Sequence, residues 1–105
     1  MKKNLALHIR KSLGAFYSRA SQLEMERDQA METMAHCDFV GWMNARNRIS
    51  VEQATSLDEL EAATGLTARA LYEMVSDCSY PYADYEPSST DLLEAIDGSG
   101  MFDNA

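Results

Sequence analysis

The stretch from Ser56 to Ser76, SLDELEAATGLTARALYEMVS, constrains the fold of this 105-residue chain more than any other. Its first four residues have the S-x-x-E spacing of a capping box, which predicts a helix that begins at Leu57. Gly65 can adopt the left-handed conformation that ends a helix, and Thr67 can cap the next one. In that next helix the apolar residues recur at helical spacing: Leu71, Met74 and Val75. The stretch therefore predicts two helices joined by a tight turn.

The segment 57–75, LDELEAATGLTARALYEMV, resembles the helix-turn-helix of small bacterial and phage repressors. It is especially similar to that of antidote (antitoxin) proteins of addiction modules, where an E-L-A-x-A-T-G-L run precedes a second helix with S-L-Y or S-L-M. Four residues before the turn glycine, this chain has Glu61 where that family usually has Ala. The resemblance implies a dimeric transcriptional regulator that binds operator DNA. A helical hairpin used only for packing is the alternative.

The resemblance also implies which side chains would contact DNA. The second helix would present Thr67, Arg69 and Tyr72 to the major groove. The N-terminal helix, if it lies alongside, would add cations that neutralise phosphate. These are Lys2, Lys3, Arg10 and Lys11.

Residues 4–35 predict one long helix, or two helices joined near Gly14. Its core positions step by three and four along the chain: Ile9, Leu13, Phe16, Ala20, Leu23, Arg27, Ala30 and Met34. Such a seam is typical of a coiled coil, in which Arg19 and Glu24 would pair across a parallel homodimer. An amphipathic helix packed within its own domain is the other interpretation, and we favour it because such helices are the commoner kind.

The net charge of -8 is distributed unevenly. Residues 1–20 hold five cations and no acid, whereas from residue 56 onward eleven acids oppose only Arg69. Non-specific affinity for DNA comes mainly from neutralised phosphates, so the acidic half is a poor DNA-binding surface. It suits a basic protein surface better. The second functional hypothesis is therefore a small acidic phage or plasmid protein that inhibits a basic, nucleic-acid-binding protein by direct contact. In the first hypothesis, the acidic half of the regulator would bind a basic toxin.

Residues 38–47 predict an apolar helix that supplies the core on which the hairpin packs. Its apolar residues are Phe39, Val40, Trp42 and Met43. A short helix from Val51 then leads into Ser56, so that residues 51–76 form the hairpin.

Residues 77–105 predict an acidic loop with tyrosines and two prolines, a short helix capped by Thr90 and ended by Gly98, and a frayed tail. Tyrosines and acids over a short amphipathic helix can form a partner-binding surface. A closing helix packed on the core is the alternative. The candidate partner-binding residues are Tyr80, Tyr82, Asp84, Tyr85, Glu86, Asp91, Glu94 and Asp97.

The sequence has no motif of an enzyme. It lacks a glycine-rich phosphate loop. It also lacks a metal-ligand cluster, because the adjacent His36 and Cys37 cannot both bind one metal from a helix and His8 is the only other histidine. We expect no catalytic residues, no metal and no cofactor. Two cysteines without CxxC spacing and the absence of a targeting or transmembrane run predict a cytoplasmic protein that does not contact the membrane. The expected fold is one small all-α domain.

Overall fold

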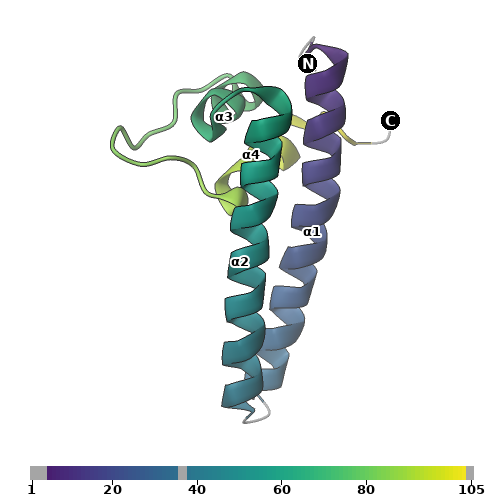
Figure 1. Cartoon of the computed structure of the whole chain (residues 1–105), viewed down its shortest axis with the longest axis vertical. Helices are drawn as coiled ribbons and strands as arrows, with labels where there is room; N and C mark the ends of the chain where they lie inside the picture. The colour runs from purple at the N-terminus through teal and green to yellow at the C-terminus, as the bar shows by residue number, and fades with distance from the viewer. Residues whose placement is uncertain (1–4, 36–37, 104–105) are drawn as a thin grey trace.

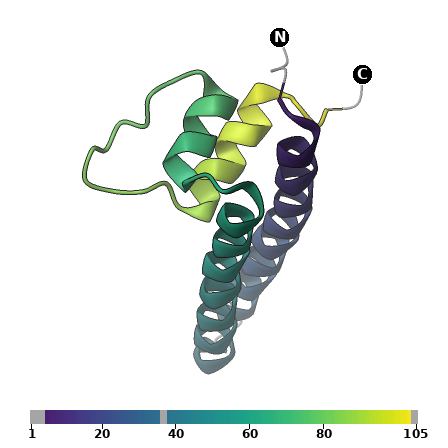
Figure 2. The ribbon, with the colours of Figure 1, turned by 45° about the horizontal axis from the view of Figure 1, so that its top comes forward.

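The computed structural model describes residues 5–35 and 38–103. These residues form four helices and no strand: α1 (Leu7–Ala35), α2 (Phe39–Thr64), α3 (Ala68–Ser76) and α4 (Ser89–Ser99). Helices α1 and α2 form a long antiparallel hairpin, and α3 and α4 lie together at the end where α1 begins and α2 ends (Figures 1 and 2). We call this the open end of the hairpin. The all-α fold with a long N-terminal helix is confirmed.

Most of the predicted seam of α1 is buried within the chain, whereas its members Arg27 and Met34 towards the end of the helix are exposed. Leu13, Phe16, Ala20 and Leu23 are each at most 3% exposed, and α1 packs chiefly against α2. The Arg19 guanidinium binds Glu52 of α2, with an N–O distance of 2.6 Å. A coiled-coil dimer through this seam would therefore require α2 to leave its place.

Helix α2 runs without a break through the positions where three shorter helices were expected, over residues 38–47, from Val51 and from Leu57, so the predicted helix starts at Val51 and Leu57 are wrong. Ser56 is only 7% exposed and lies inside the helix. Neither glycine nor proline occurs between residues 42 and 64, and Ile49, Ser56 and Leu60 all face inward, so nothing interrupts the helical pattern.

The N-terminal cap of α2 is Asp38. Its carboxylate accepts a hydrogen bond from the Gly41 backbone N–H at 3.0 Å. A Cβ on Gly41 would lie 2.3 Å from that carboxylate, so the missing side chain makes room for the cap.

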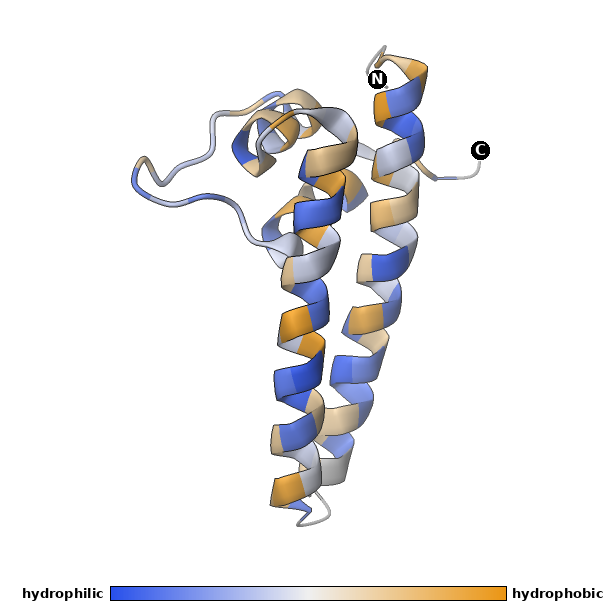
Figure 3. Cartoon of the chain, in the orientation of Figure 1, coloured by the Kyte–Doolittle hydropathy of each residue, from blue (hydrophilic) through white to orange (hydrophobic). Residues whose placement is uncertain are grey.

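The apolar stretch at the start of α2 does not supply the core, contrary to the prediction. It lies at the closed end of the hairpin (residues 26–35 and 38–50), away from α3 and α4, where Figure 3 shows hydrophobic residues on the ribbon. Phe39 and Val40 are 60% and 69% exposed. Because α2 is continuous, its first turns are carried far from the compact part of the molecule.

The turn between α2 and α3 has the predicted caps. Gly65 has φ 71° and ψ 14°, and its N–H donates to the Glu61 carbonyl oxygen at 2.8 Å. The Thr67 hydroxyl accepts from the Ala70 N–H at 3.1 Å. The Glu61 carboxylate accepts from the Ala68 N–H at 2.7 Å, which satisfies one of the free amides at the start of α3. The glutamate that departs from the repressor pattern thus caps α3.

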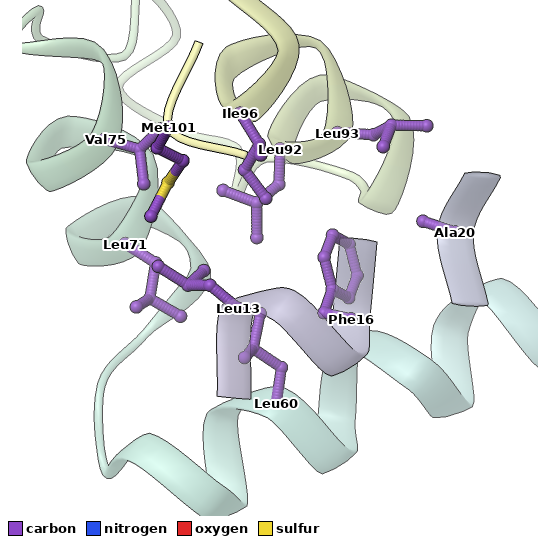
Figure 4. Close-up of a cluster of buried hydrophobic side chains, with 10 residues drawn as sticks. All are labelled: Leu13, Phe16, Ala20, Leu60, Leu71, Val75, Leu92, Leu93, Ile96 and Met101. Carbon is purple, nitrogen blue, oxygen red and sulfur yellow. The ribbon is translucent and has the colours of Figure 1, made fainter. Parts of the chain in front are cut away.

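The main core lies at the open end, where all four helices meet (Figure 4). Leu71, predicted to face inward, is fully buried, as are Leu13 and Leu92. The remaining members of the cluster are Phe16, Ala20, Leu60, Val75, Leu93, Ile96 and Met101.

Helix α4 is longer than predicted at both ends. Ser88 caps it in a capping box with Asp91, in place of the expected Thr90. The helix continues through Gly98 and ends at Gly100, whose φ is 68°. The helix starts earlier and ends later than predicted because Ser88 and Gly100 cap it in place of Thr90 and Gly98.

The predicted frayed tail is wrong for residues 101–103, while residues 104 and 105 lie outside the described residues. Met101 is 5% exposed, and the Phe102 ring packs on Tyr17 with a centroid distance of 5.3 Å. The same ring covers Gly14, where an added Cβ would meet it at 3.6 Å. Phe102 therefore fills the surface that a glycine leaves bare on α1.

Substitution by alanine should have opposite effects on stability at Gly98 and at Gly65. Gly98 has no neighbouring atom within 4 Å of an added Cβ and lies inside α4, so Gly98→Ala should stabilise the protein by about 0.5–1 kcal/mol. Gly65→Ala should cost about 1–2 kcal/mol, because its φ is left-handed. Urea denaturation measures both. A loss of stability in Gly98→Ala would place the helix end at Gly98 after all.

Candidate protein-interaction surface

The most distinctive surface is the loop from Asp77 to Pro87, which joins α3 to α4 and projects from the body of the molecule (Figures 1 and 2). Ten of the eleven residues in it are partly or fully exposed, and only Pro87 is buried. We call this segment the tyrosine loop, since it carries Tyr80, Tyr82 and Tyr85.

The tyrosine loop folds around the side chain of Arg69, which comes from the first turn of α3. One guanidinium nitrogen donates to the backbone carbonyl oxygens of Tyr82 at 2.8 Å and Ala83 at 3.3 Å, and also to that of Tyr85. A planar guanidinium has several donors in fixed directions and can hold converging carbonyl groups in this way. The loop backbone is therefore organised by one cation.

Two side chains complete the surroundings of Arg69. Glu86 accepts from the Arg69 Nε at 3.3 Å and from the Arg69 backbone N–H at 3.2 Å. The Tyr80 ring lies under the guanidinium, 5.3 Å from its carbon, at the distance of a cation–π contact. As a result the Arg69 side chain is only 25% exposed.

The aromatic rings of the loop form a ladder that starts on α3. Each ring contacts the next edge-on. The distance between ring centroids is 5.1 Å for Tyr72 and Tyr80, 5.6 Å for Tyr80 and Tyr82, and 6.4 Å for Tyr82 and Tyr85. Exposure rises along the ladder: Tyr72 and Tyr80 are half-buried, whereas Tyr82 and Tyr85 are 58% and 69% exposed. The last two rings are thus held in place and still face solvent.

The base of the ladder is fixed to α4. The Tyr80 hydroxyl donates to the Asp91 carboxylate at 2.8 Å, and the same carboxylate accepts the Ser88 N–H at 3.1 Å in the capping box. The hydrogen bond to Asp91, with the partial desolvation of the ring, raises the pKa of Tyr80 to about 12. The neutral phenol is therefore the form that the fold stabilises.

The predicted partner-binding residues divide into two groups. Tyr80, Glu86 and Asp91 hold the loop together, and Asp97 accepts a hydrogen bond from the Tyr17 hydroxyl at 2.7 Å. The others are exposed and project from the loop or from α4. These are Tyr82, Asp84, Tyr85 and Glu94.

The residues proposed for DNA contact do not gather on one surface. Arg69 is enclosed by the loop, Tyr72 packs against Tyr80, and Thr67 is exposed at the cap of α3. Arg10 and Lys11 lie on α1, which begins on the other side of α2 from α3 in both views (Figures 1 and 2). Lys2 and Lys3 lie outside the described residues.

Reasoning from the sequence missed the role of Arg69. One signal was available, because the only cation among the acids from residue 56 onward is expected to find a carboxylate. Its partner Glu86 lies 17 residues away across an irregular loop, so no local periodicity connects the two.

The described part of the chain gives little support for other kinds of site. No group of three or more potential ligands there could hold a metal ion, and no helix there is long and apolar enough to cross a membrane. Cys78 is a free, exposed thiol, while His36 and Cys37 lie outside the described residues.

No protein-family model, curated protein or solved structure matches this chain. The helix-turn-helix resemblance of residues 57–75 therefore stays a prediction.

The Tyr80–Asp91 hydrogen bond predicts a pH dependence. Because the folded-state pKa of Tyr80 lies above its unfolded value of about 10, the stabilisation is present below pH 10 and is lost as the pH rises through about 12. Asp91→Asn should return the titration of one tyrosine towards pH 10. Phenolate absorbance measures it, and Tyr80→Phe should remove the same late phase. If both variants titrate like the wild type, this hydrogen bond does not form.

Proposed function

We propose that this protein is a non-enzymatic interaction factor that docks its tyrosine loop on a basic surface of another protein. This is the second of the two sequence-based hypotheses, in which the target is a nucleic-acid-binding protein. The observation that carries it is the enclosure of Arg69, which turns an exposed loop into a fixed display of Tyr82 and Tyr85.

Pre-organisation supports this function physically. A loop that is already ordered loses less conformational entropy on binding, and tyrosine gives a large contact area with few rotatable bonds. Tyrosine is also among the residues enriched at protein interfaces.

The charge around the loop indicates the chemistry of the partner. From residue 66 onward the chain has eight acids and only Arg69 as a cation, and Arg69 is neutralised by Glu86. Asp84 of the tyrosine loop and Glu94 in the middle of α4 are both exposed. Such a surface attracts lysine- and arginine-rich proteins and repels phosphate.

The DNA-binding regulator remains the alternative proposal, and the Gly65 and Thr67 caps of the turn favour it. As a dimeric antitoxin it would bind operator DNA through α3. Arg69 would have to leave three carbonyl groups and Glu86 to reach a base or a phosphate. That cost is the reason why we rank it second.

Affinity capture from native cells tests the proposal with two matched variants. Wild type and Met25→Ser, altered at a 58% exposed residue of α1, should retain the same basic partner, whereas Tyr82→Ser/Tyr85→Ser should lose it. The contact should weaken as salt is raised. Binding of a specific DNA duplex that Arg69→Ala abolishes, with partner capture unchanged in the tyrosine variant, would establish the regulator instead.

A further inference from the structure

Helix α4 covers only part of the hairpin face on which it lies. It runs antiparallel to α1: Tyr17 contacts Asp97 near the end of α4, and Glu24, one heptad later, accepts from the Thr90 hydroxyl at its start at 3.1 Å. One further heptad along the same row of α1 is Met31, which is 52% exposed. The row continues past the start of α4 with no helix on it (Figure 1).

The facing row of α2 behaves in the same way. Leu57 packs against the main core, and Gln53 donates to Glu24 at 3.4 Å beside the start of α4. Towards the closed end the row continues at steps of three and four with Ser50, Arg46, Trp42 and Phe39. The centroids of the Phe39 and Trp42 rings are 5.8 Å apart, yet Phe39 is 60% exposed.

Two arginines, one on α1 and one on α2, line the same cavity just beyond the start of α4. Arg27 of α1 and Arg46 of α2 line a small cavity of about 120 Å³ together with Ile49, Ser50 and Gln53. Among the described residues, Arg27 pairs only with the Glu24 carboxylate, 4.0 Å away, and Arg46 lies over the Trp42 ring, 5.6 Å from its centroid, with no hydrogen bond.

This pair is unusual within the chain. Arg19, Arg48 and Arg69 each bind a carboxylate at 3.3 Å or less. In the part of this acidic chain that the structure describes, two guanidinium groups therefore line one cavity without a carboxylate closer than 4.0 Å. Exposed apolar side chains lie nearby.

We propose that this uncovered face, which we call the closed-end groove, binds an acidic amphipathic helix of a partner protein. Its apolar stripe would pack on Met31, Trp42 and Phe39, and a carboxylate would enter the cavity between Arg27 and Arg46. Helix α4 shows which chemistry this face accepts. It buries Leu92, Leu93 and Ile96 against the same side of the hairpin and carries Asp91, Glu94 and Asp97 around them.

The closed-end groove is separate from the tyrosine loop and selects the opposite charge. A chain with both surfaces would connect a basic protein to one that offers an acidic helix. The two proposals can therefore fail independently.

A synthetic peptide of residues 88–100, the α4 sequence, serves as the probe with the full chain. Trp42 is the only tryptophan and lies in the groove, so binding should change its fluorescence saturably. Anisotropy of a labelled peptide gives the affinity independently. Arg27→Glu and Arg46→Glu should each weaken binding at least about tenfold, and added salt should weaken it in the wild type.

Lys11→Glu is the matched control, because it makes the same charge change at an exposed position of α1 outside the groove. It should bind the peptide as the wild type does. Absence of binding, or binding that neither arginine variant weakens, as expected if the peptide merely displaced α4, would overturn the proposal. So would wild-type dimerisation in sedimentation that Arg46→Glu abolishes, because a second copy would then occupy the groove.

Discussion

Phe16→Asp is expected to unfold this protein. Phe16 is 3% exposed and lies among Leu13, Leu60 and Leu92 in the core where α1, α2 and α4 meet. Truncation of a buried phenylalanine alone costs about 3–5 kcal/mol, and an unpaired buried carboxylate adds to that loss. Since small domains are stable by only about 5–15 kcal/mol, the sum removes most or all of the stability. Circular dichroism should show the helical signal collapse.

Met25→Asp is the matched control on the same helix. Met25 is 58% exposed, so the same new charge should change the free energy of unfolding by no more than about 0.5 kcal/mol. A folded, monomeric Phe16→Asp variant derived from a dimeric wild type would instead support the coiled coil predicted from the seam. Sedimentation of both variants separates the two outcomes.

Arg69→Ala should release the tyrosine loop and lower the free energy of unfolding by about 1–3 kcal/mol. Hydrogen bonds to a charged group are worth about 1.5–3 kcal/mol each, but this guanidinium is partly in water and its carbonyl partners can be rehydrated. The rings of Tyr82 and Tyr85 would lose their fixed positions. Limited proteolysis within residues 77–87 should therefore become faster, and partner capture should fall together with it.

Arg69→Lys and Glu86→Gln serve as comparisons. Lysine keeps the charge but has a single nitrogen, so it cannot bind the loop carbonyl groups and the Glu86 carboxylate together as the guanidinium does, and Arg69→Lys should resemble the alanine variant. The Glu86 side chain is 57% exposed, and Glu86→Gln should cost less than about 1 kcal/mol. If Arg69→Lys keeps both the protease resistance and the stability of the wild type, the charge alone holds the loop.

Local rules recovered the features of the fold that depend on neighbouring residues. The Gly65 stop, the Thr67 cap and the inward position of Leu71 each follow from a few adjacent residues, and each is found as predicted. The capping-box spacing at Ser56 misled because Ser56 lies inside a helix that nothing before it breaks. Spacing indicates a cap only where the chain can also leave the helix.

The candidate site was harder to predict because its contacts cross long sequence separations. Tyr80, Glu86 and Asp91 were predicted to bind a partner, whereas in the structure they hold the loop together through Arg69 and the start of α4. Arg69 was interpreted as an outward cation of a DNA-reading helix, since helical geometry gives a direction but does not reveal a loop that folds back over it. Tertiary contacts of this kind have no periodic signal.

The closed end of the hairpin has a consequence for how the molecule opens. Of the side chains described there, only Ala30 and Ile49 are buried, so little apolar contact opposes separation of the two helices in this half. Segments with few buried contacts open locally at a smaller free energy than the whole domain does. Backbone amides in the closed end should therefore exchange with solvent sooner than those near Leu13 and Leu92. A partner helix bound in the closed-end groove would slow that exchange. Hydrogen exchange of the closed-end amides would therefore show whether the groove is occupied.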